Sequence, residues 1–253
     1  MKLFQDNLIF KDNIKEFKLG MSKLSTGIYP IDKMLDGGIE TDIITSFYGP
    51  SASGKTNIAL ITTYNVTRLN KKVIFIDTEG GFSFERLKQI SKEEFENSLR
   101  NILLYKPMSF LEQKKAIFLA YEKVKENPDS IGLVVVDSIS MLYRLEKGDE
   151  NVNEVNMELA KQLQILSEIA RKYNIPVLVT NQVYSLIEEK NKIGIVGGDL
   201  IKYWSKCLIE LKVYDNGVRE AILRKHRYLP EGISVKFKIV NDGIIEYKEI
   251  DKI

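Results

Sequence analysis

The chain has 253 residues, with 37 Lys and Arg against 35 Asp and Glu, which leaves a formal charge of +2. This near balance excludes an acidic tail protein and a protein that binds polyanions through bulk positive charge alone. One Cys and one His cannot form an internal disulfide or a zinc site of the Cys/His type.

The sequence divides at about residue 20, so we predict an N-terminal extension over 1–20 and one core over 21–253. The extension carries Phe4, Phe10 and Phe17 without a clear period. It is an edge hairpin, an arm that docks on a partner, or a flexible extension. Its charges interrupt the apolar residues too often for a secretory signal, and no apolar run in the chain is long enough to span a membrane. We therefore expect a cytoplasmic protein.

The next part of the chain alternates between helix and strand patterns. Ile31, Met34 and Leu35 have helical spacing, and the glycine pair 37–38 ends that helix. Further on, we predict strands over 43–48, 73–76, 102–105, 133–136 and 177–180, and helices over 56–69, 84–99, 110–125 and 155–173. This alternation is typical of an α/β fold in which helices cover both faces of a mostly parallel sheet.

After residue 182 the pattern changes to short strands separated by turn signals. These strands are predicted over 207–213, 219–223, 235–239 and 244–247. We interpret them as an antiparallel, C-terminal extension of the same sheet.

The strongest motif lies between the predicted strand 43–48 and the helix that follows it. It consists of Gly49, Pro50, Ser51, Ala52, Ser53, Gly54, Lys55 and Thr56, and fits the phosphate-loop pattern G-x-x-x-x-G-K-[ST]. The backbone N–H groups of such a loop, together with the positive end of the helix, bind phosphate oxygens. Lys55 would contact the β- and γ-phosphates, and the Thr56 hydroxyl would bind Mg²⁺. ATP and Mg²⁺ are therefore the predicted cofactors.

Polar residues also follow three other predicted strands. The carboxyl ends of parallel strands meet at one edge of the sheet, so Asp137 is expected beside the metal held by Thr56. Glu79 is our candidate for the base that orients an attacking water, although Asp77 and Glu79 could instead cap the next helix. Gln182 is placed to sense the γ-phosphate and to transmit its presence to the loop that follows.

The order of these motifs resembles that of the RecA/RadA recombinase family. The matching segments are Leu24-Ser25-Thr26-Gly27, Leu35-Asp36-Gly37-Gly38-Ile39-Glu40, the phosphate loop, Ile76-Asp77-Thr78-Glu79-Gly80, Phe84-Glu85-Arg86-Leu87, Asp137-Ser138, Leu142-Tyr143-Arg144 and Thr180-Asn181-Gln182-Val183. The resemblance covers residues 24 to about 247 and is strongest to the short archaeal paralogues of the family. It implies a RecA-like ATPase core in which Glu79 is the hydrolytic carboxylate, Asp137 the acid on the metal side and Gln182 the γ-phosphate sensor.

The resemblance also implies two loops that contact DNA, one after Asp137 and one after Gln182. The candidate DNA-binding residues are Arg144, Lys147, Lys190 and Lys192. Acidic residues occupy much of the first loop, at positions 146, 149, 150 and 154. Since phosphate neutralisation depends on basic residues, we expect weak binding by this loop and no strong strand exchange.

The densest basic cluster is Arg224-Lys225-His226-Arg227. Lys225 and Arg227 resemble residues that family members present to the nucleotide of a neighbouring subunit, but a DNA backbone contact and a solvated strand end are equally open. The leader has no Phe-x-x-Ala motif of the kind through which family recombinases polymerise. We therefore expect a monomer or a small homo-oligomer.

These features lead to three functional hypotheses. The first is an accessory protein of DNA repair and homologous recombination that binds ATP and DNA and hydrolyses ATP weakly. By resemblance, its partners would be a recombinase and a Holliday junction resolvase, whose branched-DNA cleavage it would modulate. The alternatives are a filament-forming, DNA-dependent recombinase, and a RecA-like signalling or transport ATPase with no role on DNA.

Overall fold

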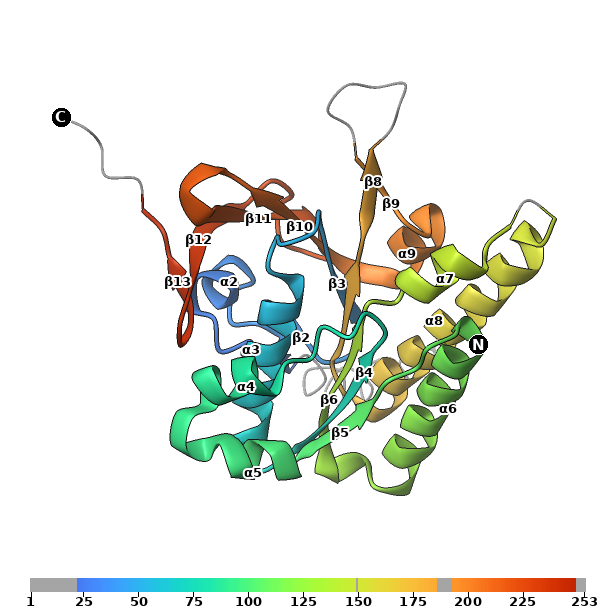
Figure 1. The fold of residues 1–253 in the computed structure, drawn as a ribbon, viewed down its shortest axis with the longest axis horizontal. Coiled ribbons are helices and arrows are strands. Elements are labelled where there is room, and N and C mark those ends of the chain that lie inside the picture. Colours follow the sequence, from blue (N-terminus) through green and yellow to red (C-terminus); the bar gives the residue numbers. More distant parts are fainter. Residues whose placement is uncertain (1–21, 149, 186–192, 249–253) are drawn as a thin grey trace, which may run out of the picture.

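One nine-stranded sheet with helices on both faces forms the body of the protein (Figure 1). The computed structural model describes residues 22–148, 150–185 and 193–248. In sheet order the strands are β13 (Gly243–Glu246), β12 (Ser234–Val240), β11 (Val218–Lys225), β10 (Ser205–Val213), β3 (Ile44–Tyr48), β7 (Val177–Asn181), β6 (Ile131–Asp137), β4 (Lys72–Asp77) and β5 (Ile102–Tyr105). The predicted α/β architecture is confirmed.

The helices divide between the two faces of the sheet. One face packs against α2 (Tyr29–Met34), α3 (Lys55–Thr67), α4 (Phe84–Ser91) and α5 (Phe95–Arg100). The other packs against α6 (Phe110–Glu126), α7 (Met141–Glu146), α8 (Val152–Tyr173) and α9 (Gly198–Trp204). Short 3₁₀ turns lie at Lys92–Glu94, Pro128–Ser130 and Asp215–Gly217.

The central strand β6 shows why its sequence lacks apolar–polar alternation. Val134 and Val136 pack in the core beneath α6 and α8, whereas Leu133 and Val135 pack in the core beneath α3. All four are fully buried. A strand covered on both faces needs apolar residues at consecutive positions, and this confirms the interpretation of 133–136.

The C-terminal strands are arranged somewhat differently from the prediction. β10 pairs in parallel with β3, from Ser205 opposite Ile44 to Glu210 opposite Tyr48, and antiparallel with β11. The antiparallel extension therefore begins only at β11. The crossover that makes β10 parallel is α9, a seven-residue helix too short to give a periodic signal in the sequence.

Two small antiparallel ribbons lie outside the main sheet. One joins β1 (Lys23–Leu24) to β2 (Ile39–Glu40), and the other joins β8 (Val183–Ser185) to β9 (Ile193–Ile195). None of the helices in the described ranges is both long and apolar enough to cross a membrane.

The parallel register brings the predicted functional segments to one edge of the sheet. Tyr48, the last residue of β3, lies opposite Asn181 of β7, and Asp77 of β4 lies opposite Asp137 of β6. The residues that follow these four strands therefore surround the phosphate loop.

Candidate functional site

The phosphate loop connects β3 to α3 and depends on glycine at both ends. A Cβ on Gly49 would lie 2.4 Å from the carbonyl oxygen of Leu211, so only glycine fits between the loop and β10. Gly54 has φ +102° and precedes the first turn of α3, where left-handed backbone favours glycine. The loop can thus curl over the N-terminus of α3, where free N–H groups and the helix dipole attract anions.

Lys55 is the first residue of α3, and its side chain folds back under the loop. Its Nζ donates to the carbonyl oxygens of Gly49 at 2.9 Å and Pro50 at 2.8 Å. Burial lowers the pKa of Lys55, while the carboxylates of Glu79 and Asp137 act in the opposite direction. Because both acceptors are neutral carbonyls, the ammonium charge is available to an anion inside the loop.

Thr56 and Asp137 meet as the sequence predicted. The Thr56 hydroxyl donates to Oδ2 of Asp137 at 2.7 Å, and the Thr180 hydroxyl donates to Oδ1. Burial raises the pKa of Asp137 to about 6, although these two hydrogen bonds oppose the shift. A Cβ on Gly81 would lie 3.4 Å from the Thr56 hydroxyl oxygen, so glycine leaves space beside this pair of oxygens.

These residues fit Mg²⁺–ATP. Hydroxyl and carboxylate oxygens are the ligands that Mg²⁺ prefers, and it usually takes only one or two from the protein, the rest coming from water and phosphates. No group of three or more His, Cys, Asp or Glu residues in the described parts of the chain could hold a metal. In the same loop, the buried hydroxyl of Ser53 has no hydrogen-bond partner among the described atoms.

Asp77 and Glu79 have different environments. The Asp77 carboxylate is buried and accepts from the N–H groups of Gly81 at 3.0 Å and Phe82 at 3.1 Å. Glu79 is exposed, and its Oε1 accepts from the Ser138 hydroxyl at 2.5 Å and from Nε2 of Gln182 at 3.0 Å. Neither acid caps α4, whose N-cap is Ser83. Only Glu79 of the two faces the phosphate loop.

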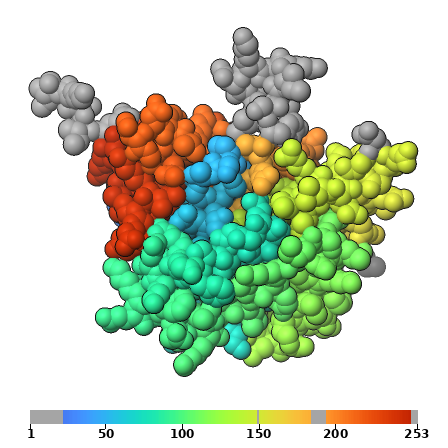
Figure 2. Space-filling view, viewed as in Figure 1, coloured from blue at the N-terminus to red at the C-terminus, as the bar shows by residue number. Residues whose placement is uncertain are grey.

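A cavity of about 520 Å³ joins these groups. Its lining residues are Gly49, Ser51 to Asn57, Glu79, Gln182, Val183, Arg219 and Ile239. In the space-filling view, the blue segment that contains the phosphate loop reaches the surface beside the orange and red C-terminal strands (Figure 2). The sheet thus brings Lys55, Glu79 and Gln182 to one cavity.

Sequence reasoning missed Arg219 and Ile239. Arg219 is the second residue of β11, and its Nε donates to the carbonyl oxygen of Ala52 in the phosphate loop at 3.1 Å. Ile239 lies on β12, and its Cδ1 would be 3.2 Å from a Cβ on Gly54. The sequence predicted both strands but carried no pattern that relates them to the loop.

Two of the four predicted DNA-binding residues lie at a second cavity of about 540 Å³. Arg144 and Lys147 line it together with Tyr143, Asn156 and the segment 195–200 at the start of α9. Lys190 and Lys192 lie outside the described residues. The contact of Arg144 and Lys147 with DNA stays a prediction.

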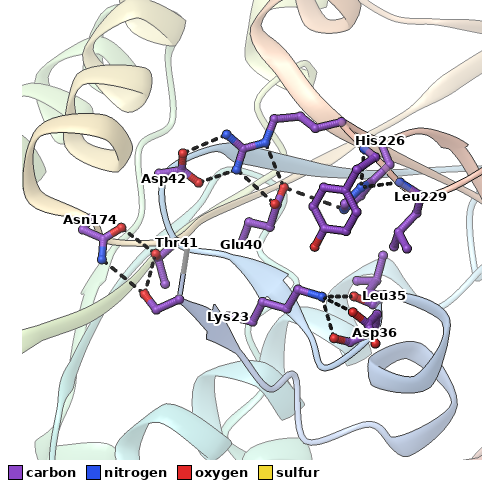
Figure 3. Close-up of polar contacts among 12 residues, drawn as sticks. Lys23, Leu35, Asp36, Glu40, Thr41, Asp42, Asn174, His226 and Leu229 are labelled. Atoms are coloured by element: carbon purple, nitrogen blue, oxygen red, sulfur yellow. Dashed lines mark hydrogen bonds and ion pairs between the residues drawn. The ribbon is translucent and has the colours of Figure 1, made fainter. Parts of the chain in front are cut away.

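Lys225 and Arg227 lie at the opposite end of β11 from Arg219, away from the phosphate loop of their own chain. Nζ of Lys225 donates to the backbone oxygens of Lys202 at 2.5 Å and Ser205 at 2.9 Å. Arg227 forms two hydrogen bonds with Asp42, at 2.6 and 2.8 Å, and pairs with Glu40 at 3.0 Å (Figure 3). Both cations therefore have partners within the chain, and their role as trans-acting fingers or DNA contacts stays a prediction.

The chain is similar to several known proteins. The Rad51 family model matches residues 18–247. A "DNA repair and recombination protein RadB" from Methanobrevibacter smithii is 43% identical over 218 residues, covering 85% of this chain and 92% of that protein. A relative of the same name from Methanothermobacter thermautotrophicus is 42% identical with the same coverage. A solved structure described as "Crystal structure of the RadB recombinase" superposes with a TM-score of 0.76 at 38% identity, covering 89% of this chain and all of that one.

Proposed function

Because the chain belongs to the Rad51 family, we propose that it acts in DNA repair and recombination as an accessory protein that binds ATP and DNA. The observation that carries this proposal is the single cavity that joins the phosphate loop and Lys55 to Glu79 and Gln182. By resemblance to the family, its partners are a recombinase and a Holliday junction resolvase, whose cleavage of branched DNA it modulates. We propose a monomer or a small homo-oligomer.

Lys55, Thr56 and Asp137 have distinct parts in the binding of Mg²⁺–ATP. Lys55 and the N–H groups of the loop would hold the β- and γ-phosphates, and Thr56 with Asp137 would hold Mg²⁺. When bound, the metal neutralises charge on the phosphate oxygens. Lys55 donates two of its three N–H groups to the carbonyl oxygens of Gly49 and Pro50, which leaves one N–H group for a phosphate oxygen.

The contacts of Glu79 support slow hydrolysis. Gln182 and Ser138 donate to the same oxygen of Glu79, Oε1, so two donors already occupy this oxygen. For Oε1 of Glu79 to accept from an attacking water, Gln182 moves to another acceptor, such as a γ-phosphate oxygen. We therefore propose a weak ATPase in which this exchange precedes each turnover.

Calorimetric titration with Mg²⁺–ATP tests nucleotide binding. The parent protein should release heat with one site per chain, and Lys55→Ala should weaken binding about 100-fold or more, because a buried ammonium is lost from the phosphate site. Lys88→Ala, which removes an exposed lysine on α4, is the matched control and should bind as the parent does. Equal affinity in the parent and Lys55→Ala would contradict the proposal.

The role on DNA has a separate test. A labelled oligonucleotide should bind in a salt-dependent manner, and the protein should exchange strands poorly. ATP turnover should change little when DNA is added. A brisk, strongly DNA-stimulated turnover together with filaments in electron micrographs would favour the alternative of a true recombinase.

A further inference from the structure

A groove of about 500 Å³ lies between α8 and the end of α9, outside the nucleotide cavity. Its lining residues are Gln164, Ser167, Glu168, Arg171, Lys172 and Trp204, and we call it the α8–α9 groove. Trp204 is the only tryptophan of the chain. One wall is thus a large aromatic ring, and the other wall is a helix that presents amide, hydroxyl and cationic groups.

The aromatic surface continues beyond the groove to Tyr203. This side chain is 68% exposed, and its ring centre lies 5.7 Å from that of Trp204 with the planes at 87°. Lys206 places its ammonium 5.2 Å from the centre of the Tyr203 ring and donates to the Tyr203 carbonyl oxygen at 3.0 Å. The exposed Tyr203 side chain therefore offers an aromatic surface next to a cation.

Positive charge surrounds these rings. The cations are Arg171, Lys172, Lys202, Lys206 and Lys225. Within the described ranges, Arg171, Lys202 and Lys206 form no ion pair, and the one acid of the groove, Glu168, already accepts from Lys172 at 3.5 Å and from the Tyr121 hydroxyl at 2.8 Å. Burial lowers the pKa of Lys225, and the charge of Lys206 adds to this shift. This excess of positive charge needs a polyanion rather than an apolar partner.

The groove and the cavity that Arg144 and Lys147 line are at opposite ends of α9. α9 runs beside α8 (Figure 1), from the cavity that Arg144 and Lys147 line at its first residues to Trp204 at its last. A helix of this length spans only about 10 Å. An extended strand of two to three nucleotides could therefore reach from one end of α9 to the other.

We propose that the α8–α9 groove, with Tyr203 and its flanking lysines, binds single-stranded nucleic acid. Unpaired bases stack on Tyr203 and Trp204, while Lys202, Lys206 and Arg171 contact phosphates. The aromatic platform selects a single strand, because bases in a duplex are already stacked on one another. This inference rests on the DNA-binding part of the proposed function and adds a site for it.

Trp204 provides a direct probe. Titration with an oligothymidylate of about 30 nucleotides at low salt should quench the fluorescence of this single tryptophan while the anisotropy of a label on the oligonucleotide rises. Tyr203→Ala should weaken binding about 5-fold or more, because a base loses its stacking partner. Tyr203→Phe keeps the ring and should bind as the parent does.

A second pair of variants tests whether the lysines beside Tyr203 contact phosphates. Lys202→Ala with Lys206→Ala should lower the slope of log affinity against log salt by about 1.4, because two phosphate contacts are lost. Lys88→Ala with Lys115→Ala removes two exposed lysines from α4 and α6 and should leave the slope unchanged. Thermal unfolding of all variants confirms that they are folded.

Several results would overturn the inference. If the parent protein binds the oligonucleotide without a change in Trp204 fluorescence, and Tyr203→Ala binds it with equal affinity, the oligonucleotide binds at another site. If Tyr203→Ala changes the oligomeric state in light scattering and leaves the affinity for DNA unchanged, the groove is a contact with a second copy of the chain. No binding by the parent protein at low salt would contradict the DNA-binding proposal itself, and this surface with it.

Discussion

Two acids only two positions apart show how contacts decide the role of a residue. Asp77 ends a buried strand, and the N–H groups of residues 81 and 82 satisfy both its oxygens, so it fixes the start of the loop. Glu79 lies beyond that turn and faces the phosphate loop. The sequence places both acids after the same predicted strand, and the backbone N–H groups of residues 81 and 82 account for the different contacts of Asp77.

Glu79→Gln should separate nucleotide binding from hydrolysis. The amide is nearly the same size as the carboxylate and still accepts a hydrogen bond from Ser138, so ATP affinity should change less than about 3-fold. Hydrolysis should fall about 100-fold or more, because the amide cannot take a proton from water. Calorimetry and phosphate release measure the two quantities, and unchanged turnover would exclude Glu79 as the base.

Cys207 gives a second prediction about a single side chain. Burial raises the pKa of its thiol to about 12, and Glu40 adds to the shift. The folded protein should therefore resist iodoacetamide at pH 8 and react fully in denaturant, as mass spectrometry can show. Since the folded pKa lies above the ordinary value of 9.0, the thiol stabilises the fold fully below pH 9 and loses this effect as the pH rises through 12. Rapid labelling of the native protein would contradict this burial.

At the scale of elements, one arginine holds three of them together. Arg86 on α4 donates through Nε to the Asn57 side chain on α3 at 2.7 Å, and its Nη groups donate to the carbonyl oxygens of Val240 and Asn241 at 2.9 and 2.5 Å. These carbonyls lie at the last residue of β12 and in the turn to β13, directly after Ile239 of the nucleotide cavity. Arg86 therefore fixes the C-terminal wall of the cavity against the helix that begins at the phosphate loop.

Arg86→Ala should lower the free energy of unfolding by about 1 to 3 kcal/mol, because several hydrogen bonds to a charged group are lost at once. Arg86→Lys keeps the charge, but a single nitrogen cannot replace the three guanidinium nitrogens that donate here, so it should be nearly as destabilising. Urea unfolding followed by circular dichroism measures both. Full stability in Arg86→Ala would show that packing alone fixes this turn.

Elements with a clear apolar pattern were predictable from the sequence, and several short ones were not. The five central strands and the helices α3, α6 and α8 follow from apolar runs or periodic apolar positions, and the phosphate loop follows from its motif. α7, α9 and the ribbons formed by β1–β2 and β8–β9 have too few residues for a period to appear. For the same reason the parallel direction of β10 was missed. Arg219 reaches the cavity only through sheet pairing across β10, which no local pattern encodes.

At the scale of the whole molecule, an ionic cluster joins the ribbon of β1 and β2 to the segment between β11 and β12. Glu40 on β2 lies 3.0 Å from Arg227 and 3.7 Å from Nε2 of His226, in the segment that follows β11 (Figure 3). Nδ1 of His226 accepts from the N–H groups of Tyr228 and Leu229 at 3.4 and 3.3 Å. The cluster thus fastens the first ribbon to the C-terminal strands.

This cluster predicts a loss of stability in mild acid. Burial lowers the pKa of His226 below 6.5, and the charges of Lys23 and Arg227 add to the shift, whereas Glu40 opposes it. The fold therefore favours neutral imidazole, and its contribution is fully present above pH 6.5 and lost as the pH falls through the lowered pKa. The melting temperature should drop more steeply between pH 7 and 5 in the parent than in His226→Asn, and equal slopes would exclude His226 as the cause.

The order of the strands also determines when the phosphate loop can fold during translation. β3 carries the phosphate loop near the beginning of the chain, but its two neighbours, β7 and β10, are made much later. Until Ser205 to Glu210 have left the exit tunnel, β3 has an open edge and the loop lacks the backbone of Leu211 against which Gly49 packs. Nascent chains should therefore acquire nucleotide affinity only near the end of translation, since a pairing this distant in sequence forms late.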